Sequence, residues 1–137
     1  MANWSLHPQL DRDTTGLGDL PLSRVLVNND ANYPWLILVP RRPDLVEVID
    51  LDEAEQTQLT TETTRVAHAL RDATGCHKLN IAALGNRVPQ LHVHVIARFR
   101  HDRAWPNPVW GVVPARTYQR AELDKFIASL RKKIWLG

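Results

Sequence analysis

The feature that most constrains the fold is a short segment in which polar and apolar side chains alternate. It reads Pro89-Gln90-Leu91-His92-Val93-His94-Val95-Ile96. Because successive side chains of a strand point to opposite faces, Gln90, His92 and His94 are predicted to share one face, while the apolar residues between them enter the core. The segment therefore predicts a strand that holds two imidazoles on one side of a sheet.

Turn residues and hydrophobic periodicity predict the neighbouring elements. Two apolar runs, Ser23–Asn28 and Trp35–Val39, flank a cluster of turn residues and predict a hairpin. Between Asp50 and Gly75 the apolar residues recur at helical spacing. Asp52 is placed to cap this helix, with Glu55 as its reciprocal partner, and Gly75 is placed to end it.

The whole chain is expected to form one α+β domain over residues 1–137. Short connections favour antiparallel pairing, which predicts an antiparallel sheet of about five strands with two main helices. The remaining predicted elements are a short helix and a loop within residues 3–20, strands over Lys78–Leu84 and Leu91–Phe99, a short edge strand over Val109–Val113, and a helix from about Arg120 to Ile134.

Charge and cysteine content argue against several classes of protein. The formal net charge is only +2 and no block of like charge is present, which argues against binding of DNA or RNA. The single Cys76 offers no disulfide and no Cys-x-x-Cys pair, which favours a reducing compartment. The longest apolar run is too short to span a bilayer, and no secretory signal is visible. We therefore expect a cytoplasmic protein without a membrane partner.

The surroundings of the histidine strand point to an anionic ligand. The loop Gly85-Asn86-Arg87-Val88 precedes the strand, and its backbone N–H groups can converge on an anion. The strand before it carries Asn80, whose side chain both donates and accepts hydrogen bonds. Neutral imidazole is a nucleophile, and an unperturbed pKa of about 6.5 leaves most of it neutral at pH 7. A nucleophile beside an anion-binding loop suits phosphoryl transfer.

The sequence resembles the histidine triad family of nucleotide hydrolases and transferases. The family motif is His-x-His-x-His followed by two apolar residues, and residues 90–96 match it except that Gln90 stands at the first position. The hairpin ending at Pro40-Arg41, the helix, the Asn-bearing strand and the glycine loop follow in the family's order, so the resemblance covers roughly residues 20–100. It implies a HIT-like fold and a homodimer that joins two five-stranded sheets.

The resemblance also implies roles for the matching residues. His92 would attack the α-phosphorus of a purine nucleotide conjugate, such as a phosphoramidate or a dinucleoside polyphosphate, and form a covalent nucleotidyl-histidine that water hydrolyses. His94 would hydrogen-bond the phosphate oxygens, and the scheme needs no metal or other cofactor. The expected substrate-binding residues are Asn80, Gly85, Asn86 and Arg87, with Asn28 as a ribose contact.

Two positions depart from the family pattern. Gln90 keeps the backbone carbonyl that helps to orient the central histidine in family members, but its side chain exchanges no proton near neutral pH. Where many members carry a further histidine, this chain has Tyr33-Pro34-Trp35. These changes are expected to slow turnover or to shift the leaving group, with Gln90, His92 and His94 as the catalytic residues.

Two other hypotheses stay open at this point. A nucleotide-binding module with little or no turnover is consistent with Gln90 and Trp35. A metal-dependent hydrolase would use His92, His94 and His101 as ligands, although a turn to solvent is the simpler explanation of His101 and the Asp102 that follows it.

Overall fold

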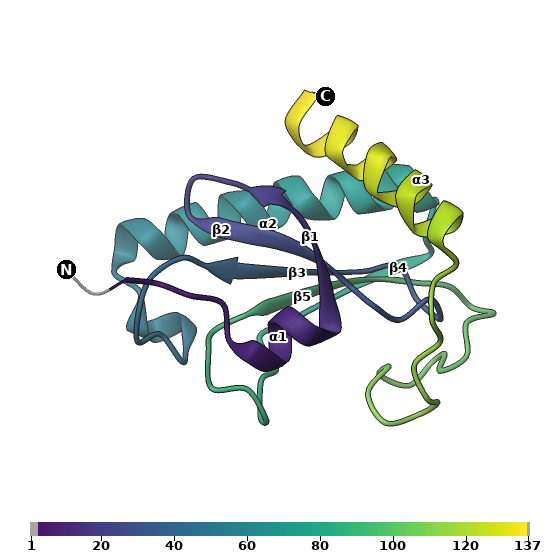
Figure 1. Cartoon of the computed structure of the whole chain (residues 1–137), viewed down its shortest axis with the longest axis horizontal. Coiled ribbons are helices and arrows are strands. Elements are labelled where there is room, and N and C mark those ends of the chain that lie inside the picture. The colour runs from purple at the N-terminus through teal and green to yellow at the C-terminus, as the bar shows by residue number, and fades with distance from the viewer. Residues whose placement is uncertain (1–2, 137) are drawn as a thin grey trace.

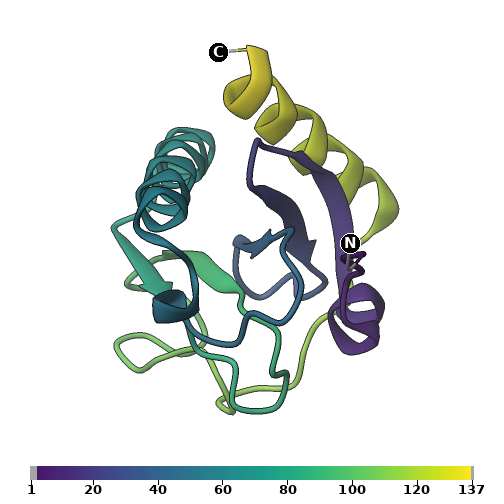
Figure 2. The ribbon, with the colours of Figure 1, turned by 90° about the vertical axis from the view of Figure 1, so that its left-hand side faces the viewer.

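The computed structural model describes residues 3–136 and contains a five-stranded antiparallel sheet with its two longer helices on one face (Figures 1 and 2). The strand order is β1-β2-β3-β5-β4, and every neighbouring pair is antiparallel. This arrangement confirms the predicted α+β fold. The strands are β1 (Thr14–Asp19), β2 (Ser23–Asn28), β3 (Trp35–Pro40), β4 (Lys78–Ala82) and β5 (Val93–Arg98).

Within residues 3–136, three α-helices accompany the sheet. They are α1 (Pro8–Asp13), α2 (Glu53–Thr74) and α3 (Arg120–Arg131), with a 3₁₀ turn at Val48–Asp50 and a π-helical turn at Lys132–Leu136. Helix α2 begins and ends as its sequence predicts, because Asp52 and Glu55 form a reciprocal capping box and Gly75 adopts the left-handed conformation at the C-cap. No helix within residues 3–136 is long and apolar enough to cross a membrane.

Both faces of the sheet are buried, each by a different part of the chain. Helices α2 and α3 cover one face and form the larger hydrophobic cluster. Helix α1, residues 4–6 and the segment 99–119 lie on the other face (Figure 2). Strands β3 and β5 are therefore buried along their whole length. The second cluster contains Leu10, Leu26, Ile37, Ile96 and Val109, among others.

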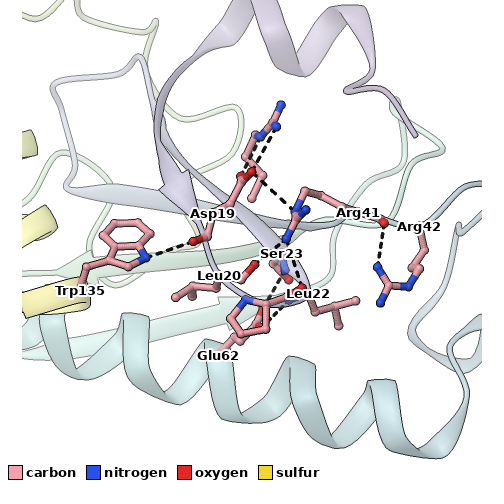
Figure 3. A network of polar contacts seen from close by, with 10 residues as sticks. Asp19, Leu20, Leu22, Ser23, Arg41, Arg42, Glu62 and Trp135 are labelled. Carbon is pink, nitrogen blue, oxygen red and sulfur yellow. Dashed lines mark hydrogen bonds and ion pairs between the residues drawn. The ribbon is translucent and has the colours of Figure 1, made fainter. Parts of the chain in front are cut away.

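A buried carboxylate ties α2 to the turn between β1 and β2 (Figure 3). Glu62 is 2% exposed and accepts hydrogen bonds from the backbone N–H groups of Leu22 and Ser23, at 2.7 and 2.8 Å. Paired donors are what a buried carboxylate requires. Glu62 therefore fixes the sheet edge against the helix, away from the two histidines.

Two sequence-based expectations were wrong. Residues 14–19 form strand β1 rather than a loop, because pairing with β2 accommodates Gly16 and Gly18 through a register shift between them. The ring of Trp135 packs so closely on Gly18 that an added Cβ would lie 2.8 Å from it. The segment Val109–Val113 is not a strand, since it lies in a series of turns rich in proline, which lacks the N–H that a ladder requires.

Candidate active site

The two histidines of the motif lie side by side at the start of strand β5. His94 is on β5, opposite Ile37 of β3 and Ala82 of β4. His92 immediately precedes the strand, which begins at Val93 rather than at Leu91. The imidazole centroids are 4.9 Å apart and each residue is 5% exposed. The alternating pattern thus places the rings together as predicted.

His92 is held in one tautomer by a main-chain contact. Its Nδ1 lies 2.7 Å from the carbonyl oxygen of Gln90. Because a carbonyl only accepts, Nδ1 carries the proton and Nε2 carries a free lone pair. Burial lowers the pKa of His92 and outweighs the opposing effect of the Gln90 carbonyl, and the charge of His7 lowers it further. The ring is therefore neutral and nucleophilic at Nε2 near pH 7.

Gly85 packs directly against the His92 ring. A Cβ at position 85 would lie 2.7 Å from Cε1 of His92 and 3.1 Å from the carbonyl oxygen of Val88. Those separations are too short for any side chain larger than hydrogen. The glycine of the predicted anion loop therefore allows the loop backbone to approach the His92 ring closely.

His94 is fixed by one donor and one acceptor. The indole Nε1–H of Trp35 donates to Nδ1 at 3.0 Å. Nδ1 is therefore unprotonated, and Nε2–H donates to the carbonyl oxygen of Leu84 at 2.7 Å. Burial lowers the pKa of His94 to about 4, despite the opposing effect of the Leu84 carbonyl. His94 is thus a neutral hydrogen-bond donor that connects β5 to the loop before it.

Replacing Trp35 with phenylalanine should leave Nδ1 of His94 without its donor. We expect a loss of about 1–3 kcal/mol in the free energy of unfolding, measured with urea, because a buried acceptor loses its partner. The pKa of His94, followed by NMR, should rise above about 4 because the neutral form loses a stabilising bond. Trp110→Phe is the matched control, since Trp110 contacts the same imidazole by its ring edge. Equal effects of the two variants on the His94 pKa would contradict this explanation.

The side chain of Gln90 reaches the segment that precedes α1. Its Oε1 accepts from the backbone N–H of His7 at 2.8 Å, and its Nε2 donates to the carbonyl oxygen of Ser5 at 2.9 Å. The N–H of the next residue, Leu91, donates to the carbonyl oxygen of Leu45 at 2.9 Å. Gln90 and Leu91 therefore join the histidine strand to two distant parts of the chain.

Comparison with known proteins identifies the fold around this site. A family model described as the HIT domain matches residues 9–101. The chain belongs to the histidine triad (HIT) family. A comparison with curated proteins gave no significant match.

Solved structures of HIT proteins superpose on nearly the whole chain. A histidine triad protein from Bradyrhizobium japonicum is 63% identical with a TM-score of 0.97, covering 98% of this chain and 100% of its own. A HIT protein from Sinorhizobium meliloti is 46% identical, with a TM-score of 0.93 and coverage of 95% and 96%. One from Marinobacter aquaeolei is 39% identical, with a TM-score of 0.94 and coverage of 97% of each chain.

In this HIT protein the predicted substrate-binding residues differ in how close they lie to the two histidines. Gly85 adjoins His92, and Asn86 and Arg87 are exposed on the same loop. Asn80 lies opposite Ile96 on β5, and its Oδ1 accepts from Arg98 at 2.7 Å. Asn28 ends β2, beyond β3 from the histidines. The structure therefore brings the loop to His92 and leaves Asn28 at a distance along the sheet.

A buried ion pair supports the segment that follows the histidine strand of the HIT domain. Arg98 is 1% exposed, and its Nε lies 2.8 Å from Oδ2 of Asp102. Burial tends to raise the pKa of Asp102, but hydrogen bonds from Arg98 and three backbone N–H groups lower it to about 2. Asp102 is thus engaged with Arg98, while His101 is exposed beside Phe99. Within residues 3–136 no three His, Cys, Asp or Glu side chains are grouped as a metal site would require.

Sequence reasoning missed several residues that shape the site of this HIT protein. Leu84 and Leu45 act through backbone carbonyl groups, and Ser5 and His7 through their main chain. Main-chain contacts leave no signal in residue type. Trp35 departs from the family pattern, but nothing in the residues around it indicates a hydrogen bond to His94.

Proposed function

We propose that this HIT protein is a nucleotide hydrolase or nucleotidyl transferase that acts on the α-phosphate of purine nucleotide conjugates. Phosphoramidates and dinucleoside polyphosphates are the substrate classes that we favour. The observation that carries the proposal is His92: a buried, neutral imidazole, fixed in one tautomer with its lone pair at Nε2, beside the loop backbone at Gly85. HIT proteins are generally nucleotide-binding proteins and hydrolases, which supports the same interpretation.

The proposed reaction has two displacements at phosphorus. Nε2 of His92 forms a bond to the α-phosphorus as the bond between phosphorus and the leaving group breaks. The leaving group keeps the electron pair of that bond and takes up a proton from solvent. A water molecule then attacks the phosphorus and displaces His92, which gives the nucleoside monophosphate. The proton that the water loses returns to solvent and replaces the one taken up by the leaving group. The Nε2–H of His94 exchanges the Leu84 carbonyl for a phosphate oxygen and stabilises the developing charge.

Release of the monophosphate from an adenosine phosphoramidate tests the proposal directly. Purified protein should produce AMP, and substrates with other leaving groups then define the preference. The alternative function is a nucleotide-binding module with little or no turnover, which Trp35 and Gln90 favour because neither side chain titrates near neutral pH. Calorimetric titration with AMP distinguishes the two, because tight binding without turnover over a broad substrate panel would support the module.

The pH dependence of turnover should follow the protonation of His92. Burial lowers the pKa of His92 below its ordinary value of 6.5, and only the neutral imidazole attacks. We therefore expect kcat/KM for AMP release to stay level as the pH falls to about 6.5 and to decline only below it. An acid limb centred above pH 6.5 would contradict this explanation.

The same pKa shifts require a control for folding. Both histidines bind protons less readily when folded than when unfolded. The unfolded state therefore binds more protons below about pH 6.5, and stability declines as the pH falls toward 4. Circular dichroism at each pH separates loss of structure from loss of catalysis.

We also propose that two copies associate through strand β4. This strand ends the sheet, and its Ile81 is 51% exposed. The opposite edge strand, β1, is contacted by α1 and α3. An open edge with an exposed apolar side chain favours pairing with another strand, which would join two five-stranded sheets. Sedimentation equilibrium should give a dimer, and Ile81→Lys should shift it toward the monomer.

A further inference from the structure

Gln90 and the N–H of Leu91 together contact three separate parts of the chain. Its side chain binds the N-terminal strap, which we define as residues 4–7 and which passes in front of the sheet before α1 (Figure 1). Its carbonyl oxygen accepts from Nδ1 of His92, and the N–H of Leu91 donates to Leu45. The Gln90–Leu91 peptide group is thus held at both of its polar ends.

The amide of Gln90 pairs with the strap much as a neighbouring strand would. A primary amide presents a donor and an acceptor on one side, and these meet the carbonyl of Ser5 and the N–H of His7 together. The donor and acceptor of a neutral imidazole point away from each other across its ring, which suits this paired contact poorly. The side-chain amide of glutamine at the first motif position therefore suits the N–H and the carbonyl that the strap presents to it.

The strap is itself well anchored, so it can hold Gln90 in place. The Arg24 guanidinium lies 5.1 Å from the ring centroid of Trp4. Leu6 packs against the second hydrophobic cluster. At the end of the strap, Nδ1 of His7 accepts from the N–H of Gln9 and caps α1. These contacts fix the strap on both sides of the two bonds to Gln90.

We infer that Gln90 is a positioning residue that couples the N-terminal strap to the orientation of His92. Hydrogen bonds to the strap hold the Gln90 side chain in place. They thereby fix the Gln90 carbonyl oxygen, which accepts from Nδ1 of His92 and orients the imidazole ring. The inference rests on the proposed function, because it assigns Gln90 a role in aligning His92 with the α-phosphorus. Gln90 acts through His92 and transfers no proton.

Two substitutions remove the coupling from opposite ends. Gln90→Met keeps a side chain of similar length without polar atoms. His7→Pro removes the backbone N–H that donates a hydrogen bond to Oε1 of Gln90. The φ of −55° at His7 suits proline. His7→Ala is the matched control, because it loses the imidazole cap and keeps the N–H. Each variant is first checked for native circular dichroism.

We expect Gln90→Met and His7→Pro each to lower kcat for AMP release by roughly 10- to 100-fold with little change in KM, since a misplaced nucleophile reduces reaction rather than binding. His7→Ala should be slowed less than His7→Pro, because it loses one anchor of the strap but keeps the backbone N–H that donates to Gln90. The double variant should be no slower than the slower single variant. A kcat for Gln90→Met within twofold of wild type, or multiplicative effects in the double variant, would overturn the inference.

The ring ¹⁵N signals of His92 provide a readout that does not need turnover. In wild type they should show one tautomer, protonated at Nδ1, and in Gln90→Met a mixture of the two. A single unchanged tautomer in folded Gln90→Met would overturn the coupling. If no substrate is turned over by wild type, the proposed function fails, while the NMR result still decides the role of Gln90.

Discussion

Replacing His92 with alanine should reduce the rate of AMP release from an adenosine phosphoramidate by about 10³-fold or more. The substitution removes Nε2, whose lone pair would form the proposed covalent intermediate. Both ring nitrogens of His94 are engaged in hydrogen bonds, so His94 does not offer the same lone pair. Loss of a nucleophile leaves only the contributions of binding and of fixed dipoles. Initial rates measured by chromatography of the released monophosphate test this directly.

His68→Ala is the control for this variant. His68 is exposed on α2, away from the sheet face that holds the site, and it should retain the wild-type rate. Because His92 is buried, the unfolding transition of His92→Ala must be measured beside its activity. A folded His92→Ala that turns over at the wild-type rate would show that the nucleophile is another group.

Gly85→Ala should lower kcat by roughly 10²-fold while leaving a folded protein. The new methyl group would lie 2.7 Å from Cε1 of His92, so the ring or the loop must move. The Val88 carbonyl oxygen, 3.1 Å away, blocks an easy shift of the methyl group. Displacement of a reacting group by about 1 Å costs on the order of 10²-fold, and overpacking costs about 1–3 kcal/mol in stability.

Gly16→Ala is the matched control, because no atom lies within 4 Å of a Cβ added there. It makes the same chemical change in strand β1, without touching the site. We expect its kcat to equal that of wild type. Equal rates for Gly85→Ala and wild type would show that the close approach of the loop to His92 has no bearing on catalysis.

The parts of the fold that were predictable are those whose signals are local. Asp52, Glu55 and Gly75 mark the ends of α2 within a turn of the helix itself. Alternation placed His92 and His94 together because two residues along a strand always share a face. Strand β1 was missed because Gly16 and Gly18 resemble a loop until β2 pairs with them.

The contacts that set the protonation of the two histidines were not predictable, because they join residues that are distant in the sequence or use main-chain groups. Trp35 and His94 are 59 residues apart, and their hydrogen bond exists only because β3 and β5 are neighbours. Leu84 acts through a carbonyl group that every residue possesses. Sequence patterns therefore located the imidazoles, but only the packed sheet shows which ring nitrogen of each holds a proton.

The hydrogen bonds between Gln90 and the strap also bear on the order in which parts of the protein fold. They join residues 83 and 85 positions apart, so the strap leaves the ribosome long before its partner exists. Closing so long a loop carries a large entropic cost, which is met only when the sheet between the two ends has formed. On the role inferred for Gln90, the orientation of His92 is completed only after the sheet has formed, and a partly folded chain carries the histidine without the hydrogen bonds that orient it.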